Sequence, residues 1–367
     1  MESKYMMRTN GILADSDIKA LIDNGVLQSI STFDTDQIQP ASLDLRLGNK
    51  AYRVRASFMP GPDTQVFDKL ERLKLHEFDL RDGAVLETGC VYIVPLLESL
   101  ALPQMLAAVA NPKSSTGRLD IFTRVITDNA QEFDKIGAGY HGQLYLEISP
   151  RTFPILVRTG SRLSQLRFRK GQSCLNEVEL YTLHKNETLI SDDVPNINDG
   201  GVALSINLKG DKNGFVGYRG KRHTSVIDVD KRAVANVLDF WEPLYDHGQK
   251  ELVLDPDEFY ILASREAIHI PPLYAAEMTP FDPLVGEFRV HYAGFFDPGF
   301  GHMEAGGKGA RVVLEVRNHE VPFILEHGQI IGRLVYEHML NRPSALYGHD
   351  IGSHYQAQGL KLSKHFK

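Results

Sequence analysis

The stretch VLETGCVYIVPLLESLALPQMLAAVANP, residues 85–112, aligns without a gap on VLDPDEFYILASREAIHIPPLYAAEMTP, residues 253–280. The offset of 168 residues is much longer than the period of about 20 to 50 residues that characterises solenoid repeats. We therefore infer a tandem duplication of one unit, whose two copies should pack through pseudo-symmetric faces. The same offset returns downstream at Leu146/Leu314, Glu147/Glu315, Pro154/Pro322, Gly160/Gly328 and Leu166/Leu334.

The repeated unit is expected to be mainly β. Short β-branched or aromatic runs such as VYIVPL, GQLYLEI, PILV, RVVLEV, PFIL and IIGRLVYE are separated by Gly, Pro and Asp turns, which favours strands. Helices are expected only over residues 15–27 and 231–245. The polar segment SDDVPNINDGG, residues 191–201, is typical of a surface connection. We therefore predict a first repeat over 1–190, a linker over 191–201, a second repeat over 202–340 and a tail over 341–367.

Composition excludes several classes of protein. The chain has 367 residues and a net charge of -7, so it offers no broad basic surface for a nucleic acid polymer. Its two cysteines are too few for a disulfide framework or a cysteine zinc site, which fits a reducing compartment. The sequence shows neither a membrane span nor an export signal, so we expect a cytoplasmic protein.

The segment NPKSSTGR, residues 111–118, combines cations, hydroxyls and a glycine between two strand-like runs. Backbone N–H groups in such a turn can bind an anion while Lys113 and Arg118 neutralise it and Ser114 and Ser115 donate hydrogen bonds. The alternative is a polar hairpin turn with solvated charges. The matching segment of the second half, residues 279–286, lacks these groups and carries Asp282, so only one repeat would retain an anion site.

Glu147 and Glu315 each lie within an apolar strand, LYLEI and VVLEV. A carboxylate beside buried neighbours needs a partner, and a raised pKa suits it to acid–base catalysis. The alternative is an exposed strand glutamate or a structural ion pair. Glu315 is the better candidate because it follows the turn FDPGF, which contains Asp297, whereas the corresponding turn of the first half has no Asp.

Metal sites find little support in the sequence. The run His302-Met-Glu304 imitates the His-x-Glu of zinc-dependent nucleobase deaminases, but the Pro-Cys-x-x-Cys that completes that site is missing. The C-terminal histidines have no regular ligand spacing and are expected to be solvated; they are His338, His349, His354 and His365. The polar tail YGHDIGSHYQAQ, residues 347–358, would be either a disordered end or a flap that closes over a ligand.

Taken in order, these motifs resemble those of the deoxycytidine triphosphate (dCTP) deaminases, which belong to the deoxyuridine triphosphatase (dUTPase)-like superfamily. The opening Ala14–Lys19 with IQPASLDLRLGN, residues 38–49, is similar to the family's N-terminal helix and first strand. The segment from Lys113 to Arg118 resembles its Arg-Ser-Ser-x-x-Arg motif, with a Lys that keeps the charge but loses the bidentate geometry. The turn AGFFDPG, the strand Val313-Leu314-Glu315, and Tyr347, His354 and Gln358 of the tail complete the match.

The resemblance implies two tandem β-clip domains, which are distorted β-barrels, and zinc-independent hydrolytic deamination of dCTP to dUTP and ammonia. Glu315 would be the general base, with Glu147 as its rival, and Ser114 and Arg118 would position water and stabilise charge. The remaining substrate-binding residues implied are Lys113, Ser115, Asp297, Val313, Leu314, Tyr347, His354 and Gln358. Magnesium would arrive with the triphosphate.

The departure from the family is the duplication, which divides the motifs between the halves. We therefore expect one composite site for each pair of repeats, in a homo-oligomer or a pseudo-symmetric two-repeat assembly, with dTTP as a possible regulator. A bifunctional enzyme that also forms dUMP, a dUTPase without deaminase activity and a non-catalytic nucleotide-binding regulator remain alternatives.

Overall fold

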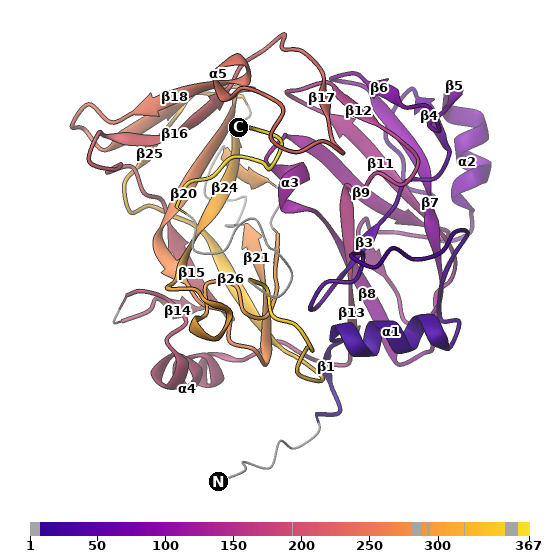
Figure 1. Ribbon diagram of the computed structural model, residues 1–367, viewed down its shortest axis with the longest axis horizontal. Coiled ribbons are helices and arrows are strands. Elements are labelled where there is room, and N and C mark those ends of the chain that lie inside the picture. Colours follow the sequence, from indigo (N-terminus) through magenta and orange to yellow (C-terminus); the bar gives the residue numbers. More distant parts are fainter. Residues whose placement is uncertain (1–7, 193, 281–287, 292–293, 319, 349–358) are drawn as a thin grey trace.

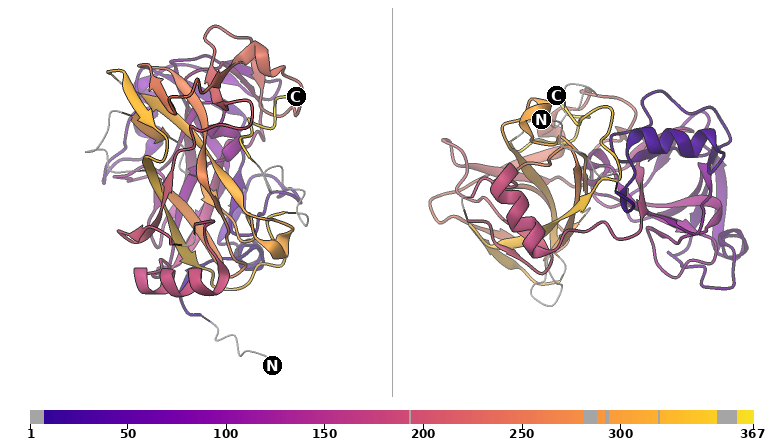
Figure 2. Two further views of the ribbon diagram at one scale, coloured as in Figure 1. Left: turned by 90° about the vertical axis from the view of Figure 1, so that its left-hand side faces the viewer. Right: turned by 90° about the horizontal axis from the view of Figure 1, so that it is seen from below.

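Two β-rich halves lie side by side in the computed structural model, each built around its own sheets (Figure 1; Figure 2, right). The structure describes residues 8–192, 194–280, 288–291, 294–318, 320–348 and 359–367. Mainly β architecture is thereby confirmed, and each apolar run singled out in the sequence forms a strand.

The first half holds two larger sheets, and a small sheet joins it to the second half through β17 (Ile227–Asp228). Their strand orders are β1-β13-β8-β10 with β3 beside β13, β5-β4-β7-β11-β9 with β2 beside β7, and β17-β12-β6. The elements are β1 (Gly11–Ile12), α1 (Asp15–Asp23), β2 (Leu27–Ser29), β3 (Leu43–Leu45), β4 (Lys50–Val54), α2 (Val66–Leu73), β5 (Lys74–Asp79), β6 (Ala84–Leu86), β7 (Val91–Ala101), β8 (Leu106–Pro112), α3 (Ser114–Gly117), β9 (Ile121–Thr127), β10 (Lys135–Ile136), β11 (His141–Pro150), β12 (Ile155–Val157) and β13 (Ser164–Lys170).

The second half repeats the two larger sheets, in the orders β14-β15-β26-β21-β23 and β18-β16-β20-β24-β22, and adds the pair β19-β25. Its elements are α4 (Glu177–Glu187), β14 (Ile197–Asn198), β15 (Gly201–Ser205), β16 (Phe215–Gly220), β17 (Ile227–Asp228), α5 (Val237–Phe240), β18 (Trp241–Tyr245), β19 (Glu251–Leu254), β20 (Phe259–Ile268), β21 (Tyr274–Pro280), β22 (Phe288–His291), β23 (Phe295–Phe296), the 3-10 helix η2 (Met303–Ala305), β24 (Ala310–Asn318), β25 (Phe323–Glu326) and β26 (Ile330–His338).

The duplication extends to the pairing of individual residues. Ile93 lies opposite Glu147 where β7 pairs with β11, and Ile261 lies opposite Glu315 where β20 pairs with β24. A one-residue slip would turn every side chain to the other face of the sheet, so equal register keeps the two glutamates in equivalent places. Loop contacts repeat as well: the Tyr92 hydroxyl accepts a hydrogen bond from Glu87 N, and the Tyr260 hydroxyl from Asp255 N.

Helical segments match the sequence less well. Helix α1 occupies most of 15–27, and the Asp17 carboxylate accepts a hydrogen bond from Ala14 N at its start. The helix expected over 231–245 is wrong: only α5 forms there, and Trp241–Tyr245 pairs with β16 as β18. Ala233 has a φ of 51°, and Pro243 supplies no N–H to continue a helix, so strand pairing prevails.

Helix α4 and strand β14 lie in the region where the first half passes into the second. Helix α4 contacts β14 and β15 of the second half, and β14 itself lies within 191–201. The predicted bounds of the repeats, linker and tail stay a prediction. Among the described residues, no helix is long and apolar enough to cross a membrane.

The halves share an apolar interface at one end of the molecule. Strand β17 of the second half pairs in parallel with β12 of the first. Phe153 packs edge-on against Phe240 and Trp241, and Phe366 packs on the same two rings. The C-terminus is thereby fixed between the halves, close to α3 (Figure 1). Val313, two residues before Glu315, belongs to this shared core.

Candidate functional site

Strand β24 presents Glu315 to the other half of the molecule. Its alternate residues Leu314 and Val316 belong to the core of the second half, whereas Val313 belongs to the core shared with the first half. Strand alternation therefore places Glu315 on the face that meets the first half. The predicted contacts Val313 and Leu314 lie on opposite faces of the strand, so of these two side chains only that of Val313 lies on the same face as Glu315.

Arg118 reaches Glu315 from the first half. It ends the short helix α3, and its Nε lies 3.8 Å from Glu315 Oε1. Both side chains are buried. Burial raises the pKa of Glu315 to about 8, while the Arg118 charge and the backbone N–H of Glu315 itself act to lower it. A carboxyl group that titrates near neutral pH can both accept and return a proton.

A second ion pair crosses between the halves beside the first. Arg317 bonds Asp120 through its guanidinium, and Thr152 donates a 2.6 Å hydrogen bond to Asp120 Oδ2. Arg317 also donates to the Asp257 carbonyl at 2.6 Å. The two ion pairs therefore have opposite orientations. The first half supplies the cation Arg118 to Glu315 and the anion Asp120 to Arg317.

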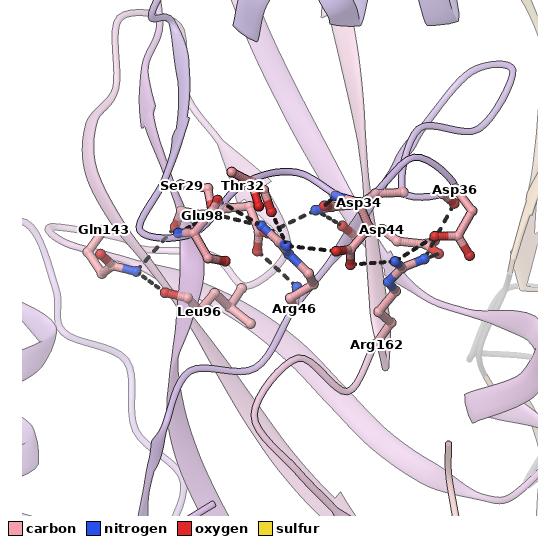
Figure 3. A network of polar contacts seen from close by, with 12 residues as sticks. Ser29, Thr32, Asp34, Asp36, Asp44, Arg46, Leu96, Glu98, Gln143 and Arg162 are labelled. Carbon is pink, nitrogen blue, oxygen red and sulfur yellow. Dashed lines mark hydrogen bonds and ion pairs between the residues drawn. The ribbon is translucent and has the colours of Figure 1, made fainter. Parts of the chain in front are cut away.

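Lys113 pairs with Asp44 at the start of the predicted phosphate segment. Asp44 also lies 3.6 Å from Arg162 Nη1, which belongs to the network drawn in Figure 3. In that network Arg162 bonds Asp34 at 2.6 Å and Asp36 at 2.8 Å. Lys113 is therefore close to the charged side chains of Asp44 and Arg162. Its side chain remains partly exposed, with 20% of its surface accessible.

The last residues of the chain cover the phosphate segment. Ser363 Oγ donates to the Ser115 carbonyl at 2.8 Å, and Arg118 Nη1 donates to the Lys361 carbonyl at 2.8 Å. Burial lowers the pKa of Lys364 to about 8, and the charge of Lys113 acts in the same direction. Reasoning from sequence missed Lys361, Ser363 and Lys364, although the run KLSK offered the signal of two cations and a hydroxyl.

His365 fixes this segment, contrary to the expectation that it is solvated. Its side chain is buried, with Nε2 2.9 Å from the Val229 carbonyl and Nδ1 2.9 Å from Ser363 Oγ. Burial lowers its pKa to about 4. The neutral ring is thus favoured, with the Nε2 proton directed at the carbonyl, so Nδ1 is an acceptor that competes with the Ser115 carbonyl for the single hydroxyl proton of Ser363. His338 is also largely buried, and burial lowers its pKa.

Tyr347 lies against the turn that carries Asp297, through its contacts with Pro298 and Phe300. Tyr347 N donates to the Pro298 carbonyl at 2.8 Å, and its ring lies 5.6 Å from that of Phe300. Arg167 of the first half donates to Asp297 Oδ1 at 3.1 Å. Burial raises the pKa of Asp297, while the charges of Arg167 and Lys113 act to lower it. Asp297 therefore lies within the electrostatic reach of the Lys113 segment.

Glu147 occupies the equivalent place in the first half but has a different partner. It bonds Arg124 Nε at 3.0 Å and Nη2 at 2.5 Å, and the Arg124 guanidinium stacks 3.6 Å from the Phe133 ring centroid. The structure thus brings Arg118 of the Lys113–Arg118 segment to Glu315, whereas Glu147 pairs with Arg124 of its own half.

Four residues named in the sequence analysis lie outside the described part of the chain: His349, His354 and Gln358 of the tail, and Asp282 of the second half. Among the described residues, no group of three His, Cys, Asp or Glu side chains is placed to hold a metal ion.

Comparisons with known proteins agree along the whole chain. Residues 9–172 match a model of the N-terminal domain of 2'-deoxycytidine 5'-triphosphate deaminase, and residues 176–366 match a model of its C-terminal domain. A solved 2'-deoxycytidine 5'-triphosphate deaminase from Agrobacterium tumefaciens is 74% identical, with a TM-score of 0.87, over 90% of this chain and 100% of that one.

Curated relatives are shorter matches. A "dCTP deaminase, dUMP-forming" from Sulfurihydrogenibium sp. is 33% identical over 166 residues, 43% of this chain and 83% of the relative. A "dCTP deaminase" from Pectobacterium atrosepticum is 32% identical over 165 residues, 42% of this chain and 82% of the relative.

Proposed function

The chain belongs to the 2'-deoxycytidine 5'-triphosphate deaminase family, and from that premise we propose that it deaminates dCTP to dUTP and ammonia at a single composite site. The observation that carries the proposal is the buried Glu315 facing Arg118 across the two halves. The dUTPase-like fold fits the same assignment.

Glu315 acts as the general base. It takes a proton from water, the resulting hydroxide attacks C4 of the cytosine, and a tetrahedral intermediate forms. The proton is then returned to the amino group, which leaves as ammonia, and the proton of the new C4 hydroxyl passes to N3 as the C4 carbonyl of the uracil ring forms. A pKa near 8 suits both transfers, because acid–base catalysis is most efficient when the pKa lies close to the working pH.

The residues of the first half stabilise charge around this reaction. Arg118 and Ser114 position the water and stabilise the intermediate, because buried donors act strongly where charge develops. Lys113 and Ser115 bind the triphosphate, and Lys113 exchanges its contact with Asp44 for phosphate oxygens. Magnesium accompanies the triphosphate as part of the substrate, and no zinc takes part.

The residues of the second half hold the nucleoside. Asp297 accepts the deoxyribose 3'-hydroxyl, and Val313 and Leu314 of β24 line the place of the base, with Val313 as the side-chain contact. Tyr347, His354 and Gln358 belong to the tail that closes over the substrate. Closing expels water and strengthens each polar contact within the site.

A bifunctional enzyme that continues from dUTP to dUMP is the second candidate. It is favoured by one finding, since several curated relatives carry the name "dCTP deaminase, dUMP-forming". A dUTPase without deaminase activity and a non-catalytic regulator have less support, because neither requires a glutamate held near neutral pKa. We further propose cytoplasmic action, a homo-oligomeric or pseudo-symmetric two-repeat assembly, and dTTP as a regulator.

The test is chromatography of the nucleotides formed when the full chain is incubated with dCTP and magnesium, beside a sample treated with a zinc chelator. Formation of dUTP in both samples is the expected result, and dUMP would select the bifunctional enzyme. Loss of product on zinc chelation would contradict the mechanism, and bound dCTP without any product would identify a regulator.

A further inference from the structure

The ion pair between Asp120 and Arg317 joins the two halves one step away from the catalytic contact. Asp120 follows Arg118 by two residues, and Arg317 follows Glu315 by two residues on β24. Successive side chains of a strand alternate between its faces, so Glu315 and Arg317 project from the same face. The contact of Arg118 with Glu315 and the contact of Asp120 with Arg317 therefore lie next to each other on one face of β24, and both join the two halves.

Among the described residues, the Asp120–Arg317 pair makes more hydrogen bonds than the Arg118–Glu315 pair. Asp120 and Arg317 are both buried, and Arg317 Nη2 bonds Asp120 Oδ2 directly. Thr152 Oγ1 donates to Asp120 Oδ2 at 2.6 Å and accepts from Arg317 Nη2 at 3.0 Å. In contrast, Arg118 Nε and Glu315 Oε1 are 3.8 Å apart. A buried, multiply bonded pair resists separation because removal of one partner leaves a buried charge uncompensated.

The backbone of Asp120 has an unusual conformation and is fixed by hydrogen bonds on both sides. Asp120 has a φ of 55°, which is a left-handed backbone conformation that residues other than glycine seldom adopt. Its N–H donates to the Gly117 carbonyl at 2.9 Å, and its carbonyl accepts from Arg151 N at 2.9 Å. The turn that carries Arg118 is thus fixed by the same residue that binds Arg317.

The duplication supplies an internal comparison. At the offset of 168 residues, Arg317 corresponds to Ser149, which follows Glu147 in the first half. The strand bearing Glu147 therefore has no cation two residues later, and its glutamate bonds Arg124 of its own half. The cation occurs on the strand whose glutamate faces the other half.

We infer that Asp120 and Arg317 are positioning residues that set the spacing of the two halves so that Arg118 faces Glu315 in the deamination reaction. Neither would touch the substrate. The inference rests on the proposed function, and it predicts that disturbing the pair weakens catalysis through Arg118 while leaving nucleotide contacts in place.

The experiment compares Asp120→Asn, Arg317→Gln, the double variant and the conservative Arg317→Lys with the full wild-type chain. Because a misplacement of about 1 Å can cost roughly a hundredfold in rate, each single variant should lower kcat for dCTP about 10- to 100-fold with a smaller change in KM. The double variant should be no worse than the poorer single variant, and Arg317→Lys should restore part of the rate. Arg219→Gln, which removes the exposed pair with Glu242, is the matched control and should keep wild-type kcat.

Two further readouts separate positioning from mere stabilisation. Arg118 is the charged side chain that acts on Glu315 and lowers its pKa, so its withdrawal should move the acidic limb of the pH–rate profile to higher pH. A crystal structure of Asp120→Asn should show Arg118 Nε farther from Glu315 Oε1 than 3.8 Å. Variants that lose melting temperature but keep kcat, the pH profile and that distance would overturn the inference. A wild-type chain that releases no ammonia would instead refute the proposed function, and the crystallographic distance would still decide the positioning role.

Discussion

Glu147 and Glu315 occupy the same place in two copies of one domain, yet their surroundings differ. Both are buried on the strand next to an edge of their sheet, opposite an isoleucine in identical register. Glu147 is neutralised by Arg124 at 2.5 Å within its own half. Glu315 faces Arg118 of the other half at 3.8 Å, and its pKa is raised to about 8. Both carboxyl groups are buried, so burial alone does not distinguish them. They differ in the distance to the arginine, which bonds Glu147 directly but lies farther from Glu315.

Replacing Glu315 by Gln should have the largest effect. The amide keeps the shape of the side chain but cannot accept a proton from water, so kcat should fall about 10²- to 10⁴-fold. Binding of dCTP should change little. Steady-state release of ammonia, beside equilibrium binding of dCTP, measures both quantities, and Glu147→Gln is the matched control. Full activity of the Glu315 variant would transfer the role of base to Glu147.

Deleting residues 361–367 should have the next largest effect. The deletion removes the hydrogen bonds to Arg118 and Ser115 and the ring contacts of Phe366. Two hydrogen bonds worth about 0.5–1.5 kcal/mol each correspond to a loss of roughly 5- to 150-fold in kcat/KM. Ser363→Ala, which removes one of them, should lose less. An unchanged kcat/KM for the truncated chain would show that this segment does not belong to the site.

Replacing Glu147 by Gln should affect stability and spare turnover. Arg124 would lose its charged partner while its guanidinium remains stacked on Phe133, so the free energy of unfolding should fall by about 1–3 kcal/mol. Chemical denaturation measures this loss. If Glu147→Gln lowers kcat as strongly as Glu315→Gln, the contrast between the two halves is invalid.

The pH dependence of stability should give the most specific effect. Glu315 binds its proton more tightly in the folded chain, with a pKa of about 8 against the ordinary 4.5. The unfolded chain therefore binds fewer protons between these values, and the contribution of Glu315 to stability falls as pH rises from about 4.5 to about 8. Glu315→Gln should accordingly raise the melting temperature at pH 8.5 relative to wild type, with little difference at pH 5. Equal differences at both pH values would contradict the raised pKa.

The sequence predicted what repetition and strand periodicity encode. The offset linking Glu147 to Glu315 reappears as equal register in β7–β11 and β20–β24. The division of motifs also anticipated that the Lys113–Arg118 segment and Glu315 come from different halves, and the structure brings Arg118 to Glu315.

Contacts without a periodic signal could not be predicted. Asp120 meets Arg317, and Ser363 meets Ser115, only because the halves pack together. The burial of His365 depends on the same packing, and a lone histidine near the end of a chain gives no sign of it. The helix expected over 231–245 failed for a related reason, since pairing of β18 with β16 outweighs local helix preference.

The central claim is that the two halves build one site, and the stoichiometry of nucleotide binding tests it most directly. Isothermal titration of dCTP with magnesium into the Glu315→Gln chain avoids turnover and counts sites per chain. The account predicts one nucleotide bound per chain, with binding weakened when Lys113→Ala is added in the first half. Two nucleotides per chain, or binding that is indifferent to Lys113, would contradict a composite site.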